Sequence, residues 1–133
     1  MAQNGKVKVL KFALLLGIIE NFVYGLGFLL IPGTLVHLSG GNLVDAGWLR
    51  WSGGALIALG IGALMVYNKP EKQNTFVTTY SLFFLLAGLG LLYSWMMHEY
   101  SGANSWFIAF PTLLKLILSA LLFWGRNQAK EIL

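Results

Sequence analysis

Two charged residues, Glu20 and Lys115, lie deep within long apolar segments of the sequence. A charge at the centre of a membrane costs about 2.5 to 3.5 kcal/mol on insertion scales, so each of these side chains needs a compensating contact. Glu20 is eight residues from Phe12, and Lys115 is nine residues from Trp124, the expected boundaries of two spans on one side. At a rise of about 1.5 Å per residue, both charges lie about 12 to 14 Å from that boundary. We therefore expect them to form an ion pair.

Polar residues surround both charges and extend the predicted pair into a patch. Asn21 and Tyr24 follow the glutamate, while Thr112 and Ser119 flank the lysine at helical spacings. The pair has two interpretations. It either fixes the register of two helices, since desolvation of both ions consumes most of their attraction, or it forms a polar floor for a ligand head group or a proton-accepting site.

A second polar cluster is expected at the other membrane boundary. Its members are His37, Asp45, Arg50, His98, Glu99 and Tyr100. Arg50 falls in the first turn of its predicted helix, where the helix dipole disfavours a cation, so we expect a partner such as Asp45, Glu99 or a tryptophan ring. Its guanidinium either snorkels to water or lies above a narrow slot that suits an anionic head group. The predicted ligand-binding residues are Glu20, Asn21, Tyr24, Arg50, Thr112, Lys115 and Ser119.

Composition excludes several other kinds of chemistry. The chain has no cysteine, which excludes disulfides, thiolate metal sites and thiol redox chemistry. Its two histidines are too few to specify a metal site, and neither is placed within a span to hold a haem. No phosphate loop, nucleophile elbow or zinc-protease motif occurs. We therefore predict no catalytic residue, no metal, no cofactor and, because the basic residues lie at span ends, no nucleic-acid partner.

Membrane-spanning helices must position these residues. The chain of 133 residues is 57% hydrophobic and 11% charged, which is too few charged residues to cover a soluble domain. A spanning helix needs about 20 mainly apolar residues. Four segments qualify, at about residues 12–31, 46–67, 76–97 and 106–124. Because the connections are short, we predict an all-α, up-down-up-down four-helix bundle that forms one domain over residues 1–133.

Local signals set the expected ends of these helices. Pro32 stops the first, Asp45 caps the second, and Gly125 is expected to cap the end of the fourth. Pro111 lies inside the fourth span and predicts a kink or a loosened first turn. The loop that follows the first span, up to Gly40, is too apolar for a free loop, so we expect one or two helical turns on the membrane interface, placed as a lid.

Basic residues gather on one side of the predicted bundle. They are Lys6, Lys8, Lys11, Lys69, Lys72, Arg126 and Lys130. By the positive-inside rule, both termini are expected in the cytoplasm, in a multi-pass protein of the inner (plasma) membrane. The aromatic residues then form two belts, with Trp48, Trp51, Trp95 and Trp106 at the outer boundary and Tyr67, Tyr80 and Trp124 at the inner one.

Small residues are expected to mark helix contacts, because helices in lipid associate through close packing and polar contacts. They recur in three spans as Gly17, Asn21 and Gly25; as Gly54, Ala58 and Gly62, with Gly53 and Gly60 beside them; and as Ala87, Gly88 and Gly90. Packing is the ordinary interpretation of such glycines. The alternative is that they line a slot for a ligand.

Two glycine-rich stretches, GLGFLLIPG at Gly25–Gly33 and LRWSGGALIALGIG at Leu49–Gly62, resemble DoxX-like and related small bacterial inner-membrane families. The resemblance in layout covers nearly the whole chain and implies a four-helix membrane fold. Some members of those families are similar to a small subunit of a thiosulfate–quinone oxidoreductase. No catalytic residue carries over to this chain, so the resemblance leaves the activity open.

The leading functional hypothesis is a non-enzymatic membrane module in the lipid bilayer. It either binds a lipophile with a polar head, a quinone or a lipid, or serves as an accessory subunit of a larger membrane complex. An alternative is a homodimeric proton-coupled transporter of small solutes that uses Glu20, which fits the outline of small multidrug transporters except for Lys115 at the same depth. A lipid-modifying enzyme with Glu20 or His98 as base is third.

Overall fold

The computed structural model describes residues 2–41, 45–99 and 106–133, which form five helices and, within those ranges, no strand. The helices are α1 (Ala2–Leu30), α2 (Pro32–Leu38), α3 (Ala46–Asn68), α4 (Asn74–Met96) and α5 (Trp106–Gln128). All but α2 are long and apolar enough to cross a membrane. The predicted all-α bundle of four spans is therefore confirmed, whereas the side of the membrane on which its ends lie stays a prediction.

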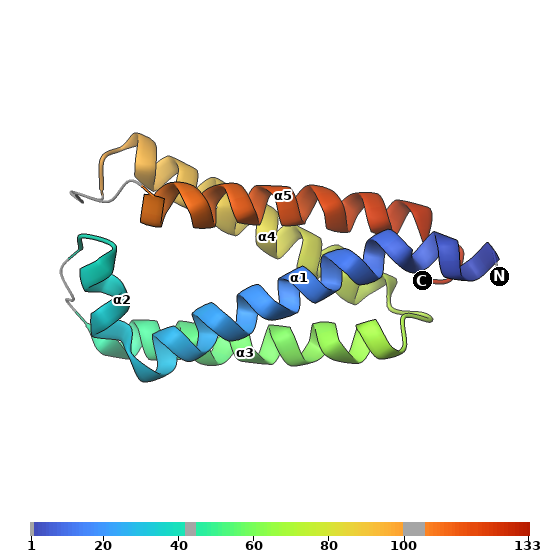
Figure 1. Cartoon of the computed structure of the whole chain (residues 1–133), viewed down its shortest axis with the longest axis horizontal. Coiled ribbons are helices and arrows are strands. Elements are labelled where there is room, and N and C mark those ends of the chain that lie inside the picture. Colours follow the sequence, from blue (N-terminus) through green and yellow to red (C-terminus); the bar gives the residue numbers. More distant parts are fainter. Residues whose placement is uncertain (1, 42–44, 100–105) are drawn as a thin grey trace.

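The four long helices form two hairpins that separate toward one end of the molecule. Helix α1 packs along α3, and α4 packs along α5. Helix α1 begins beside α5 and ends beside α3, so it joins the hairpins diagonally (Figure 1). Both termini lie at one end, here called the terminal end, and α2 lies at the other, here called the α2 end (Figure 1). Helices α3 and α4 lie close together only toward the terminal end.

Glycines allow α1 to approach both of its neighbours. A Cβ atom added at Gly53 of α3 would lie 2.6 Å from the Gly25 carbonyl oxygen of α1. One added at Gly125 of α5 would lie 2.6 Å from the Cα atom of Leu10. The prediction that Gly125 caps a helix is therefore wrong: α5 continues to Gln128, and this glycine is the point where α5 packs on the α1 backbone.

The small-residue face predicted for α1 is buried, but the one predicted for α3 is wrong. Gly54 and Ala58 are exposed, whereas Gly53 and Gly60, one position before and two positions after them, are buried against α1. Only Gly62 of the predicted set meets another helix, at the Phe76 ring of α4. Two stripes of small residues run along α3, and the spacing alone does not show which one faces a partner.

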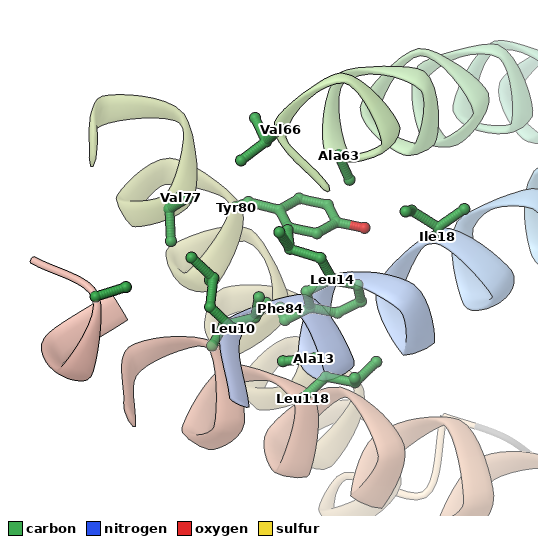
Figure 2. Close-up of a cluster of buried hydrophobic side chains, with 12 residues drawn as sticks. Leu10, Ala13, Leu14, Ile18, Ala63, Val66, Val77, Tyr80, Phe84 and Leu118 are labelled. Atoms are coloured by element: carbon green, nitrogen blue, oxygen red, sulfur yellow. The ribbon is translucent and has the colours of Figure 1, made fainter. Parts of the chain in front are cut away.

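A hydrophobic core fills the terminal half of the bundle. Side chains from all four long helices converge there, as Figure 2 shows for Leu10, Leu14, Val66, Tyr80, Phe84 and Leu118, among others. Tyr80 is fully buried, so its predicted place in the aromatic belt at the membrane boundary is wrong. Packing of the core at this end holds the two hairpins together.

The helix ends follow local chemistry, with one extension. Helix α1 starts at Ala2 rather than near Phe12, because lysine favours helices and the lysine-rich stretch simply continues the span beyond its apolar part. The short helix expected after Pro32 is α2, and Asp45 caps α3 by accepting from the Gly47 N–H at 2.8 Å. Helix α5 runs without interruption through Pro111, which removes one backbone donor from its first turns.

The ends of α2 and α4 share one capping motif with different residues. In each, a backbone N–H donates to a carbonyl five residues earlier, Gly41 to Val36 and Glu99 to Ser94, both at 3.0–3.1 Å. This Schellman motif needs a left-handed residue just before the donor. Gly40 fills that position in α2 with φ 76°, and His98 fills it in α4 with φ 54°. The histidine therefore holds a backbone conformation that glycine adopts more easily.

Candidate functional site

A cavity of about 830 Å³ lies between the two hairpins in the α2 half of the molecule. All five helices contribute to its wall. The lining residues are Val23, Tyr24 and Phe28 of α1; Leu35 of α2 and its C-cap Ser39; Trp51, Ser52, Ala55, Leu56 and Leu59 of α3; Phe83, Ala87, Gly90 and Leu91 of α4; and Phe107, Ile108, Pro111 and Lys115 of α5.

The cavity exists because α3 and α4 diverge and carry small residues where they face each other. Near the terminal end the two helices meet where Gly62 lies against Phe76. Beyond this contact the wall residues include Ala55, Ala87 and Gly90, and a Cβ atom added at Gly90 would meet nothing within 4 Å. Of the two interpretations of Gly90, a packing contact or the lining of a slot, the open space beside this residue agrees with the second.

The wall is apolar over most of its length and polar at the floor. On the α5 side the cavity extends from Phe107 to Lys115, which lie eight positions apart, roughly 12 Å along the helix axis. Aromatic rings and aliphatic side chains make up most of this wall, while its charged residue, Lys115, lies at the inner end. A concave, mostly apolar pocket with a few convergent polar groups is the usual form of a small-molecule site.

The floor of the cavity contains the predicted ion pair. The Lys115 ammonium donates a hydrogen bond to Glu20 Oε1, and the side chains are only 11% and 1% exposed. The ammonium also lies 4.9 Å from the centre of the Tyr24 ring, a cation–π distance. Of these three residues Lys115 and Tyr24 line the cavity, and Glu20 lies behind them. The ion pair thus forms between α1 and α5 as the matching depths predicted.

Behind the floor, Asn21 connects α1 to α4. Its side-chain oxygen accepts a hydrogen bond from the Tyr80 hydroxyl, and both residues are fully buried. Glu20 Oε2 and Asn21 Nδ2 are buried with no hydrogen-bond partner among the described residues. This role of Tyr80 was not expected from the sequence, although its spacing from the buried Val77, Ser81 and Phe84 places it on the same face of α4.

Two further predicted residues are buried but do not reach the cavity. Thr112 donates to the Ile108 carbonyl of its own helix at 2.6 Å. Ser119 donates to the Ser81 carbonyl of α4 at 3.0 Å, so it joins the two helices of one hairpin. Asn21, Thr112 and Ser119 therefore contribute to helix packing, and their predicted role in ligand binding has no support from the cavity wall.

Arg50 lies away from the cavity, at the α2 end. Its Nη1 donates to the Leu29 carbonyl in the last turn of α1 at 2.5 Å. This contact places a cation at the negative end of the α1 dipole, which is favourable. The expected partners, Asp45, Glu99 or a tryptophan, are therefore replaced by a backbone carbonyl.

The rest of the second polar cluster does not gather into a site. His37, Asp45, His98 and Glu99 are exposed, and Tyr100 lies outside the described residues. Within residues 2–41, 45–99 and 106–133, no three histidine, aspartate or glutamate side chains are grouped so that they could hold a metal ion. The cavity, rather than this cluster, is the candidate site.

Comparison with known proteins gives one match. The model of a family described as a domain of unknown function, DUF4345, matches residues 9–126, which include all four spans and the whole floor of the cavity. Neither the curated proteins nor the solved structures give a match.

Proposed function

The chain belongs to the DUF4345 family of domains of unknown function, and we propose that it is a membrane module that binds a lipophile with a polar head in the cavity between its two hairpins. The head group contacts Lys115 and Tyr24 at the floor. The hydrocarbon tail lies along the apolar walls of α3 and α4. A quinone and a lipid are both members of this ligand class.

The observation that carries the proposal is an apolar cavity that ends on a buried charged residue. Its volume of about 830 Å³ falls within the roughly 300–1,000 Å³ of small-molecule sites. Trp51 lines the cavity and is nevertheless 70% exposed on the apolar outer surface of a spanning helix. A ligand that enters beside this residue comes from the membrane at the level of the expected outer aromatic belt, which favours a lipophile over a water-soluble solute.

The geometry favours binding over proton-coupled transport. A carboxylate that exchanges protons with a substrate must be reachable from the substrate pathway. Glu20 is 3% exposed, accepts from Lys115 and lies behind the cavity wall. The transporter hypothesis therefore receives no support from these contacts, and the DoxX-like resemblance adds only the expectation of a bundle of this kind.

The test fills the cavity and leaves the packing intact. Gly90→Leu places a side chain in open space on the wall, and Gly54→Leu places the same side chain on the exposed face of α3, where a Cβ also meets nothing within 4 Å. Native mass spectrometry from a mild detergent is expected to show about one retained lipophile per chain in the wild type and in Gly54→Leu. Gly90→Leu is expected to lose at least nine-tenths of it, because the added side chain occupies the space of the tail.

Either of two results would contradict the proposal. One is a Gly90→Leu protein that stays folded and retains as much lipophile as Gly54→Leu. The other is a wild-type protein that carries no lipophile and takes up none when lipid extract is added. Retention of another polypeptide chain instead of a lipophile favours the accessory-subunit hypothesis.

A further inference from the structure

We infer that the cavity selects an uncharged head group that accepts hydrogen bonds, such as a carbonyl oxygen, and rejects anionic and cationic lipids. The inference rests on the proposed function and specifies the class of ligand. Three features of the described wall support it: the net charge of the floor, the hydrogen-bond donors that remain there, and the sign of the charge that faces the cavity.

The floor is already neutral without a ligand. Lys115 and Glu20 compensate each other, and the remaining described wall residues carry no charge. A carboxylate or phosphate head would add a negative charge with no cation on this wall to balance it. Arg50 does not line the cavity and is held by the Leu29 carbonyl. An unbalanced charge in a low-dielectric site is strongly unfavourable, so anionic lipids are disfavoured.

Besides its two serines and the indole N–H of the largely exposed Trp51, the wall has its side-chain hydrogen-bond donors, Lys115 and Tyr24, at the floor. The hydroxyl of Ser39 donates to the Leu35 carbonyl at 2.8 Å, and that of Ser52 donates to the Trp48 carbonyl at 2.9 Å. Both wall serines thus use their hydrogens within their own helices. An ammonium has three N–H groups, and Lys115 uses one on Glu20 among the described residues. A head group that reaches Lys115 therefore meets a donor and must supply an acceptor.

The sign of the exposed charge disfavours cationic heads. Lys115 lines the cavity, and its ammonium lies 4.9 Å from the ring centre of Tyr24, which lines the cavity too, whereas Glu20 is not among the lining residues. A cation that enters along the wall meets the like charge first. Neutral carbonyl lipophiles avoid both penalties, and quinone rings and glycerol esters both supply this group.

The experiment is a competition between four probes on the purified full-length chain in mild detergent. They are a short-chain ubiquinone, dioctanoylglycerol, decanoate and decylamine, supplied at equal concentration at neutral pH and scored by native mass spectrometry. The two neutral carbonyl probes are expected to bind at least tenfold more tightly than either ion. The relative affinity of ubiquinone and dioctanoylglycerol shows whether a quinone ring or a glycerol ester is the better source of the carbonyl.

A double variant tests whether the ion pair causes the preference for uncharged head groups. Glu20→Leu combined with Lys115→Met removes both charges together, so neither is left bare in the apolar interior. In the double variant the preference for carbonyl probes over decanoate or decylamine is expected to fall below threefold, because the floor has lost both the charge and the ammonium donor. If the folded double variant still prefers carbonyl probes over decanoate and decylamine as strongly as the wild type does, Glu20 and Lys115 do not determine the selectivity.

The wild-type competition decides the inference whether or not the double variant can be purified. If decanoate or decylamine binds as tightly as the carbonyl probes, the inference is wrong. If all four probes bind alike and all are lost in Gly90→Leu, the cavity is a lipophile site without the proposed selectivity. If none binds to the wild type, the proposed function fails as well.

Discussion

A carboxylate and an ammonium at mid-membrane depth stabilise each other mainly because neither is left uncompensated. Glu20 and Lys115 are both nine-tenths or more buried, and they join α1 of one hairpin to α5 of the other. Desolvation of the two ions offsets most of their attraction, so the net contribution of the intact pair to stability is small. The loss of one partner has a larger effect because it leaves a bare charge.

A double-mutant cycle measures this coupling. Glu20→Leu or Lys115→Leu alone is expected to lower the free energy of unfolding by about 3–5 kcal/mol, whereas the double variant recovers most of that loss. Thermal unfolding followed by circular dichroism in detergent, with folded yield as a second readout, gives the interaction term. Additive losses in the double variant would show that the two side chains do not depend on each other.

His98 offers a test of the capping geometry at α4. His98→Gly is expected to raise the free energy of unfolding by about 1 kcal/mol, because glycine adopts the left-handed backbone at φ 54° without the steric penalty of a Cβ atom. Glu99→Gly is the matched control, since Glu99 has no positive φ. Equal effects of the two substitutions on the melting temperature would contradict the capping explanation.

At the scale of the helices, contact geometry depends on which glycine of a stripe faces a neighbour. Gly53 and Gly125 bring α3 and α5 against the α1 backbone, whereas Gly54 faces outward. In the sequence Gly53 and Gly54 look alike, because they are neighbours in an apolar helix with other small residues nearby, and Gly125 resembles a helix cap. A single added methyl group distinguishes them.

Gly125→Ala is expected to destabilise the fold by about 1–3 kcal/mol, because the new Cβ would overlap backbone atoms of Leu10 that cannot rotate away. Gly54→Ala, which meets nothing within 4 Å, is expected to be neutral or slightly stabilising owing to the higher helix propensity of alanine. Thermal melting of both variants in the same detergent checks the difference. Destabilisation of both to the same extent would contradict the assigned contact.

On the scale of the whole molecule, two hairpins joined at the terminal end and separated at the α2 end create the cavity. The terminal end is closed by the shared core and by contacts between chain segments, among them the Lys72 N–H that donates to the Ile132 carbonyl at 3.2 Å. The described residues of the α2 end form no comparable core. The terminal end therefore stabilises the fold, and the α2 end contains the cavity.

The lysines and arginines of the terminal end predict the orientation of the molecule in the membrane. Reporter fusions to the C-terminus are expected to give a fluorescent green fluorescent protein and an inactive alkaline phosphatase, because the positive-inside rule places this end in the cytoplasm. Fusions in the turn between α3 and α4 are expected to behave in the same way. The reverse pattern at both positions would show that the molecule is inserted the other way round.

The sequence by itself determined the features that depend on local composition. Each of these features follows from residues that are near each other in the chain. They are the four apolar segments of spanning length, the break at Pro32, the cap at Asp45 and the equal depth of Glu20 and Lys115. Hydropathy and the helical rise act over short distances, so these predictions needed no knowledge of which helices meet.

Only the tertiary structure decided which helices contact one another and through which faces. Four features depend on residues that are far apart in the sequence. They are the buried face of α3, the separation of α3 from α4, the burial of Tyr80 and the contact between Arg50 and Leu29. The floor of the candidate site was visible in the sequence because charges in apolar segments are rare. Its walls were not, because the small and aromatic residues that line a cavity are the same types that pack against a neighbouring helix or face lipid.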